Sequence, residues 1–151
     1  MMDKIVVFVI DDLKYALPLN AVIRAIHAIE IRKLPQAPEI VAGIINLAGR
    51  IIPVIDVRKR FGLKCREISA DDELIIAETG KRIIALWIDH VSGVQQITAE
   101  QYTDTADSLS FAAFIKGVVK LEGEIILIYD LEQFLNLEEE SQLETALTTI
   151  Q

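Results

Sequence analysis

Residues 43–63 read GIINLAGRIIPVIDVRKRFGL, and residues 117–137 read GVVKLEGEIILIYDLEQFLNL. Aligned without a gap, the two stretches are identical in seven of 21 columns, and several other columns exchange one aliphatic residue for another. The identical pairs are Gly43/Gly117, Leu47/Leu121, Gly49/Gly123, Ile51/Ile125, Ile52/Ile126, Asp56/Asp130 and Leu63/Leu137. Residues 15–22 match residues 84–91 at a slightly different offset. We therefore interpret the chain as two diverged copies of one structural unit.

Each copy contains a predicted β-hairpin. Runs of isoleucine and valine lie on both sides of a short turn, which reads LAGR in the first copy and LEGE in the second. Such β-branched runs around a glycine predict a tight hairpin turn in which Gly49 and Gly123 supply the residue with positive φ. Gly43 and Gly117 are also interpreted as structural glycines rather than contact residues.

Each hairpin is followed by a short helical pattern. Asp56 and Asp130 end the second strand of their copies and stand where a helix N-cap is expected, because an aspartate side chain can accept a hydrogen bond from the first helical N–H groups. Gly62 and Asn136 follow at the position where a left-handed residue commonly ends a helix. The pattern therefore predicts a capped helical turn after each hairpin.

The rest of the chain predicts further short strands and one longer helix. Six strands are predicted at residues 5–10, 15–18, 25–31, 74–77, 82–88 and 93–97. Short strands separated by short turns are typical of small barrels, so we expect one barrel in each half. Residues 141–144 read SQLE, a capping-box pattern, and the apolar residues that follow at helical spacing predict a C-terminal amphipathic helix.

The expected organisation is a single domain, residues 1–151, with two lobes. The lobes span approximately residues 15–66 and 72–136, and residues 4–14 and 137–151 are expected to pack across them. A chain of this length can bury roughly 70% of its unfolded surface, so it needs no disulfide or metal to fold.

Composition restricts the function classes. Hydrophobic residues make up 52% of the chain, yet no uncharged stretch approaches the roughly 18–20 residues that span a bilayer, so membrane insertion is not expected. The net charge of −8 repels nucleic acid, and the basic run at residues 58–60 is interpreted as a solvated helix face. Cys65 is the single cysteine, which favours a reducing, cytoplasmic location.

Candidate catalytic groups are few. Asp56 and Asp130 occupy equivalent positions and suggest a carboxylate dyad, but each is more simply explained as a helix cap. Cys65 with His27 or His90 would be a thiol nucleophile and its base, although nothing in the spacing favours that pairing. No metal-ligand or phosphate-loop spacing is present in the sequence, so we expect no metal and no cofactor. A non-enzymatic binding protein is the favoured interpretation.

Residues 34–63, LPQAPEIVAGIINLAGRIIPVIDVRKRFGL, resemble the signature region of the CheW-like family, the coupling proteins of bacterial chemotaxis. The resemblance extends over most of the chain, through YALPLNAV, ALWIDHVSGV and FIKGVVKLEGEIILIYDLEQFL. It implies a mainly β fold of two intertwined, pseudo-symmetric SH3-like barrels of five strands, with short helices and a C-terminal helix. It also implies an adaptor that joins the cytoplasmic tips of methyl-accepting chemoreceptors to the regulatory domain of a CheA-type histidine kinase.

The same resemblance implies a receptor-binding groove between the two units. The residues that it assigns to the groove are Val22, Arg24, Ile26, Asn46, Leu47, Ala48 and Val91. Two of them depart from the family, whose members usually carry arginine at position 48 and commonly an acid at position 24. We hypothesise that Arg24 supplies the guanidinium that position 48 lacks. The alternative is that the groove has drifted, in a divergent array or a non-motility pathway.

Three functions remain open from the sequence. The first is a stand-alone chemotaxis adaptor, which the start of the chain and its C-terminal cap favour. The second is a CheW-like module of a non-motility chemosensory pathway, or of a larger signalling protein such as the kinase. The third, from a different class, is a hydrolase that uses Asp56 and Asp130.

Overall fold

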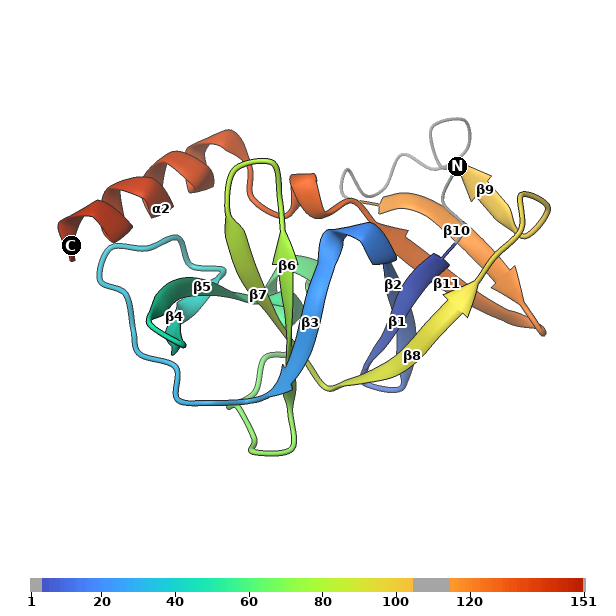
Figure 1. Ribbon diagram of the computed structural model, residues 1–151, viewed down its shortest axis with the longest axis horizontal. Coiled ribbons are helices and arrows are strands. Elements are labelled where there is room, and N and C mark those ends of the chain that lie inside the picture. The colour runs from blue at the N-terminus through green and yellow to red at the C-terminus, as the bar shows by residue number, and fades with distance from the viewer. Residues whose placement is uncertain (1–3, 105–114, 151) are drawn as a thin grey trace.

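The computed structural model describes residues 4–104 and 115–150, in which β-strands form two sheets and two short barrels (Figure 1). The strands are β1 (Lys4–Ile10), β2 (Leu13–Pro18), β3 (Val22–His27), β4 (Val41–Leu47), β5 (Arg50–Asp56), β6 (Glu73–Glu78), β7 (Ile83–Ile88), β8 (His90–Gln96), β9 (Tyr102–Asp104), β10 (Ile115–Leu121) and β11 (Glu124–Tyr129). The helical segments are η1 (Leu19–Ala21), α1 (Val57–Phe61), η3 (Leu131–Gln133) and α2 (Leu137–Thr149). The expected mainly β fold of two SH3-like barrels is confirmed.

The two copies of the repeat exchange their N-terminal hairpins. One sheet has the strand order β8-β1-β2-β11-β10-β9, and the other has the order β3-β6-β7-β5-β4. The β1–β2 hairpin of the first copy therefore completes the barrel of the second copy, and β6–β7 completes the barrel of the first (Figure 1). The predicted lobes 15–66 and 72–136 do not coincide with these sheets, because consecutive segments of the chain contribute to both barrels.

Strand registers confirm the duplication in detail. In the parallel pairing of β5 with β7, Val54 lies opposite Ala85, and in that of β11 with β2, Ile128 lies opposite Ala16. The sequence alignment of the two copies equates Val54 with Ile128 and Ala85 with Ala16, so the two pairings are equivalent. A β-bulge also recurs at equivalent places. In β3 it lies between Val22 and Arg24, opposite β6, and in β8 it lies between Val91 and Gly93, opposite β1. The two copies thus share backbone irregularities as well as sequence.

Each barrel has its own apolar interior, and a third cluster lies between the barrels. The two interiors contain the equivalent pairs Ile5/Leu74, Val7/Ile76, Ala16/Ala85, Val119/Ile45, Ile126/Ile52 and Ile128/Val54. The third cluster, the central cluster, draws buried residues from both copies, including Phe8, Ile55 and Tyr129. Phe61 of α1 stacks on Tyr129 with ring centroids 4.0 Å apart, so side chains of both copies pack directly together.

The hairpin turns have the backbone that the sequence predicts. Gly49 and Gly123 have φ of 87° and 80°, and the residues before them, Ala48 and Glu122, are also in the left-handed region. Two consecutive positive φ values are typical of the type I′ turn, whose twist matches that of the strands. Gly43 is structural for a different reason, since a Cβ there would collide with the backbone of the segment that precedes β4.

The predicted caps are partly confirmed. The Asp56 side chain accepts a hydrogen bond from the Lys59 N–H at 3.3 Å, and Gly62, with φ of 73°, ends α1. The side chain of Asp130 accepts from the Glu132 N–H at 3.1 Å, but the segment that it caps is a single 3₁₀ turn, η3.

The prediction for Asn136 is wrong. Its side chain accepts from the Glu139 N–H at 2.7 Å, and the Glu139 carboxylate accepts from the Asn136 N–H at 2.9 Å. This reciprocal pair is a capping box, so Asn136 begins α2 instead of ending the preceding helical turn. The helix therefore starts before the predicted capping box at residues 141–144, with Leu143 buried against the central cluster.

Candidate binding surfaces

The apolar residues of the predicted groove divide between two cores. Val22 of β3 and Val91 of β8 are equivalent residues, and both are half-buried against the central cluster. Ile26 and Leu47 are half-buried against the interior of the barrel that contains β4 and β5. Packing in a core explains each of these side chains, so their role in a groove stays a prediction.

The polar residues of the predicted groove do not meet. The Asn46 side-chain oxygen accepts a hydrogen bond from the Gly49 N–H at 2.9 Å and so stabilises the hairpin turn that contains Ala48. Arg24 is exposed, and its side chain makes no hydrogen bond or ion pair within the described residues. Its strand, β3, lies at the opposite edge of the sheet from β4. The structure therefore provides no direct contact between Arg24 and the turn at position 48.

The interpretation of the basic run as a solvated helix face is wrong. The Arg58 side chain is only 6% exposed, and it donates hydrogen bonds to Asp11 at 2.9 Å and to Asp89 at 2.8 Å. Arg66 donates to the same Asp89 at 2.8 Å and to Asp72 at 2.7 Å. We call these five residues the α1 junction. It connects α1 to the β1–β2 turn and to the end of β7.

The electrostatics of the α1 junction favour ionised carboxylates. Burial alone would raise the pKa of Asp89, but hydrogen bonds from the Asp11 N–H and the Arg58 guanidinium outweigh burial and lower that pKa. Burial likewise opposes ionisation of Asp72, whose pKa is lowered by Arg66 and by hydrogen bonds from the Ser69 N–H and the Trp87 indole. The buried Arg58 and Asp72 side chains, together with the more exposed Asp11, Arg66 and Asp89, thus connect segments that are distant in the sequence.

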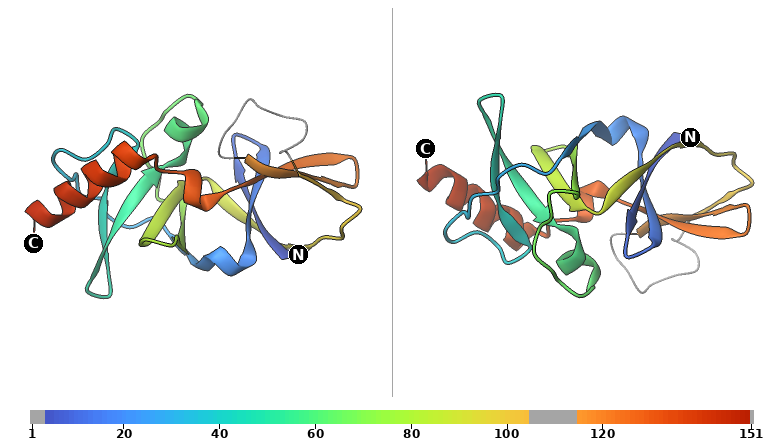
Figure 2. Two further views of the ribbon diagram at one scale, coloured as in Figure 1. Left: turned by 90° about the horizontal axis from the view of Figure 1, so that it is seen from above. Right: turned by 90° about the horizontal axis from the view of Figure 1, so that it is seen from below.

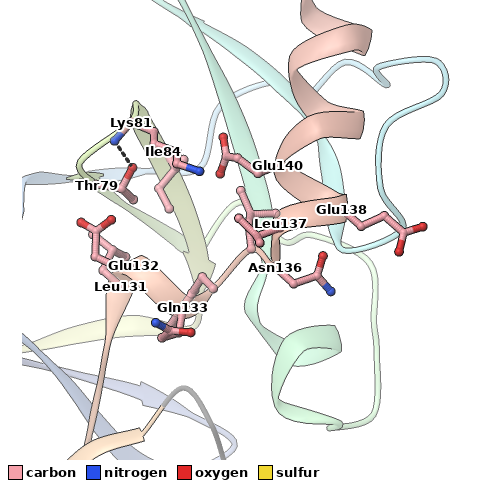
Figure 3. Close-up of a pocket in the computed structure, with 12 residues that line it drawn as sticks. Thr79, Lys81, Ile84, Leu131, Glu132, Gln133, Asn136, Leu137, Glu138 and Glu140 are labelled. Atoms are coloured by element: carbon pink, nitrogen blue, oxygen red, sulfur yellow. Dashed lines mark hydrogen bonds between the residues drawn. The ribbon is translucent and has the colours of Figure 1, made fainter.

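The equivalent place in the second copy has different chemistry. There the alignment puts Glu132 of η3 at the position of Arg58, and Gly80 of the β6–β7 turn at the position of Asp11. The Gly80 N–H donates to the Glu132 carboxylate at 2.7 Å. Beside this contact lies a hollow of about 560 Å³ (Figure 3). We call the η3 segment, the β6–β7 turn and the first residues of α2 the η3 junction.

The hollow has an apolar floor and a charged rim, to which Lys81 contributes a cation and Glu132, Glu138 and Glu140 contribute carboxylates. Its floor is formed by the buried side chains of Ile84, Leu131 and Phe134. In Figure 3, Glu132 and Glu140 lie on opposite sides of it, and Leu137 stands at the start of α2. The Leu137 side chain is 82% exposed. A second hollow of about 400 Å³ shares Lys81, Leu137 and Glu140 with the first, so the two adjoin along the start of α2.

The described residues provide no catalytic constellation at the aspartates. Asp56 and Asp130 each accept a hydrogen bond from the backbone of their own helical turn, and no hydrogen bond joins them. Within the described ranges there is no group of three or more His, Cys, Asp or Glu residues that could hold a metal ion. No helix in that part of the chain is long and apolar enough to cross a membrane.

The architecture is that of two exchanged SH3-like barrels, which present different chemistry on equivalent surfaces. Comparison with known proteins agrees with this architecture. The chain belongs to the CheW-like family, because the profile of the CheW-like domain matches residues 4–139. It is an adaptor of the chemotaxis type and not an enzyme, and the hydrolase alternative has no support.

Two curated relatives and one solved structure are similar over most of their lengths. The chemotaxis protein CheW of Thermotoga maritima is 32% identical over 128 residues, which cover 85% of this chain and 84% of that protein. The protein of the same name from Rhizobium meliloti is 32% identical over 108 residues, or 70% of each chain. The scaffolding protein TtCheW of Thermoanaerobacter tengcongensis superposes with a TM-score of 0.83 and 34% identity, covering 92% of this chain and 96% of that one.

Proposed function

We propose that this chain is a cytoplasmic, stoichiometric adaptor that binds a CheA-type kinase through its hairpin tips and a chemoreceptor tip through β3 and β8. The observation that carries the kinase part is a pair of equivalent exposed isoleucines. Ile51 of β5 is 38% exposed and Ile125 of β11 is 61% exposed, each directly after a type I′ turn. Exposed aliphatic side chains on a rigid turn are suited to contact another barrel.

The two tips differ in charge. Arg50 precedes Ile51 and is exposed, and its side chain makes no hydrogen bond or ion pair within the described residues. Glu124 precedes Ile125 and pairs with Lys14 at 2.9 Å, while Glu122 in the same turn is exposed. Figure 2 shows the β10–β11 hairpin projecting at one end of the molecule and the β4–β5 hairpin projecting sideways from the other half. The two hairpin turns have the same backbone conformation but side chains of opposite charge, which favours two different partner surfaces.

The receptor part of the proposal is supported by two free strand edges. β3 is the edge strand of one sheet and β8 is the edge strand of the other. Each therefore has one side whose backbone groups are not used in the sheet, which a partner segment can pair with. Val22, Arg24 and Ile26 lie on β3 and Val91 lies on β8, whereas the other predicted groove residues, Asn46, Leu47 and Ala48, lie on the β4–β5 hairpin.

A capture experiment with two purified fragments tests the proposal. A receptor cytoplasmic tip and the regulatory domain of a CheA-type kinase are titrated separately onto the immobilised chain. Ile51→Ser and Ile125→Ser should each weaken kinase binding about tenfold and leave receptor binding unchanged. Ile68→Ser is the matched control, because Ile68 is also exposed, at 38%, but lies between α1 and β6, outside both hairpins.

Two outcomes would overturn the proposal. One is the absence of saturable binding to either fragment by the unaltered chain. The other is an equal loss of kinase binding in Ile68→Ser and in the two tip variants, which would show that loss of any exposed apolar side chain has the same effect.

A double-mutant cycle tests the role of Arg24 in receptor binding. The relocation hypothesis predicts that Arg24→Glu combined with Ala48→Arg binds the receptor tip better than the sum of the single changes. Because the two residues do not contact one another, such coupling would have to act through a shared group of the receptor. Additivity within about 0.5 kcal/mol would show instead that the groove has drifted.

A further inference from the structure

The two strand edges proposed above to bind a receptor belong to different sheets, and the side chain of Glu73 joins those sheets. β3 is the edge strand of one sheet and β8 is the edge strand of the other. The Glu73 carboxylate, at the start of β6, accepts a hydrogen bond at 2.6 Å from the backbone N–H of Val91, near the start of β8. Because β6 is the strand that pairs with β3, this hydrogen bond connects the β8 edge to the strand beside the β3 edge.

The hydrogen bond lies where the chain crosses from one barrel to the other. A single residue, Asp89, separates β7 in one sheet from β8 in the other (Figure 1). The Asp89 carboxylate accepts hydrogen bonds from Arg58 and Arg66, which hold the crossing itself. Val91 follows two residues later, at the bulge of β8. Since a bulge interrupts the ladder of backbone hydrogen bonds, a side-chain contact at this point has a large influence on where the strand lies.

The first copy of the unit forms the equivalent bulge without such a carboxylate. The residues equivalent to Glu73 and Val91 are Lys4 and Val22. A lysine ammonium cannot accept a hydrogen bond, and the Val22 N–H donates instead to the carbonyl of Leu19 in η1. The bulge therefore does not require a carboxylate at this position. In the first copy the edge strand is held by its own preceding turn, whereas in the second copy it is held by a side chain from the other barrel.

A partner that contacts both edges has to match the spacing between them. Val22 and Val91, one on each edge, are both half-buried against the central cluster, so the two edges already share one support. A surface whose parts are fixed before binding loses less conformational entropy when a partner binds. We propose that Glu73 is a positioning residue of the receptor-binding surface, whose carboxylate holds the start of β8 in a fixed place relative to β3. The proposal rests on the receptor part of the proposed function.

Three variants of the full chain test the proposal. Glu73→Ala removes the acceptor, Glu73→Gln keeps a side-chain oxygen at the same reach, and Glu78→Ala is the matched control, because Glu78 is an exposed carboxylate at the other end of β6. Titration of a purified receptor cytoplasmic tip onto the immobilised chain should show about tenfold weaker binding for Glu73→Ala. Glu73→Gln and Glu78→Ala should stay within about threefold of the unaltered chain.

Binding of the kinase regulatory domain separates a positioning role from a general loss of structure. Glu73 lies in neither the β4–β5 nor the β10–β11 hairpin, so all three variants should bind the kinase domain as the unaltered chain does. An equal loss of receptor and kinase binding in Glu73→Ala would show a general structural role and overturn the proposal.

Amide hydrogen exchange measured by NMR gives a readout that needs no partner. The Val91 N–H should exchange about tenfold faster in Glu73→Ala than in the unaltered chain, because its acceptor is lost. In Glu73→Gln the same amide should stay protected, and in all variants the amides within β6 should keep their rates. An unchanged Val91 exchange rate in Glu73→Ala would contradict the proposed positioning.

The receptor titration also distinguishes failure of this inference from failure of the proposed function. Absence of saturable receptor binding by the unaltered chain would refute the receptor part of the proposed function, and the inference with it. Full binding by Glu73→Ala would refute the inference alone. Tighter binding by Glu73→Ala would do so too, because it would show that the carboxylate occupies a backbone donor that the receptor uses.

Discussion

The α1 junction and the η3 junction occupy equivalent places in the two copies, yet one is closed and the other is open. Arg58 in the first is 6% exposed and surrounded by carboxylates. Glu132 in the second accepts one backbone hydrogen bond beside a hollow of about 560 Å³. The strand registers around the two places are the same. A duplicated fold can thus keep its strand pairing while a cation at one junction, Arg58, is replaced by a carboxylate, Glu132, at the other.

The path of the chain after each helical turn explains the difference. After α1 the left-handed Gly62 turns the chain back, and the following loop brings Arg66 and Asp72 into the cluster. After η3 the chain continues through the Asn136 cap directly into α2. No returning loop covers the second junction, so its floor is shielded only by the start of α2. One junction is closed by ion pairs, and the other leaves an open hollow.

The largest expected effect is on the α1 junction. Arg58→Met removes the cation that Asp11 and Asp89 share, and we expect the free energy of unfolding to fall by about 2 kcal/mol, because the hydrogen bonds of the buried guanidinium to both carboxylates are lost. Urea denaturation measures this change. Lys59→Met is the matched control, since Lys59 is the exposed next residue of the same helix and should change stability by less than about 0.5 kcal/mol. Equal effects of the two changes would refute a special role for Arg58.

Lowering the pH should also weaken the α1 junction, with a smaller loss of stability than Arg58→Met causes. The pKa values of Asp72 and Asp89 are lower in the folded protein than the unfolded value of about 3.9, so their contribution to stability is complete above that pH. It is lost as the pH falls through the folded-state values. Urea midpoints measured between neutral pH and about pH 3 should fall less steeply for Arg58→Met than for the unaltered chain, because Asp89 has then lost one of its partners. Parallel curves would contradict this assignment.

The smallest effect is expected at the η3 junction. Glu132→Gln keeps a side-chain oxygen that can accept from the Gly80 N–H, and the group is exposed, so stability should change by less than about 0.5 kcal/mol in urea denaturation. A loss of more than about 1 kcal/mol would show that Glu132 is as structural as Arg58. The comparison between a closed and an open junction would then no longer hold.

Local features of the fold were predictable from the sequence because they depend on neighbouring residues. Gly49 and Gly123 identify the hairpin turns, since each type I′ turn needs positive φ next to two β-branched strands. Asp56 identifies the start of α1, because its side chain reaches the backbone only three residues away. The alignment of the two copies likewise identifies equivalent strands before their partners are known.

Features that depend on distant residues were not predictable in this way. A hairpin has the same alternating pattern whichever barrel it completes, so the exchange of β1–β2 and β6–β7 leaves no local signal. Arg58 lies in a run of basic residues, and its partners Asp11 and Asp89 are 47 and 31 residues away in the chain. The cap at Asn136 did have a local signal, because Glu139 three residues later completes a capping box.

The open junction is likewise a property of distant segments. Its floor combines Ile84 of β7 with Leu131 and Phe134, and its rim adds the start of α2. Leu137 is aligned with Leu63 of the first copy, which predicts a buried role. Leu63 is half-buried against the central cluster, whereas Leu137 is 82% exposed. The difference arises because the chain enters a long helix at this position in one copy and a returning loop in the other.

The exchange of hairpins also has a consequence for how the chain is made on the ribosome. The sheet of β3 to β7 has all its strands once Ile88 has been synthesised, so it can form early. The β1–β2 hairpin emerges first but has to wait for β8, β10 and β11, the last of which ends at Tyr129. During that interval the oldest part of the nascent chain holds a two-stranded ribbon with both edges unsatisfied. Translation of the segment after Ile88 therefore sets how long the newborn protein is exposed to mispairing.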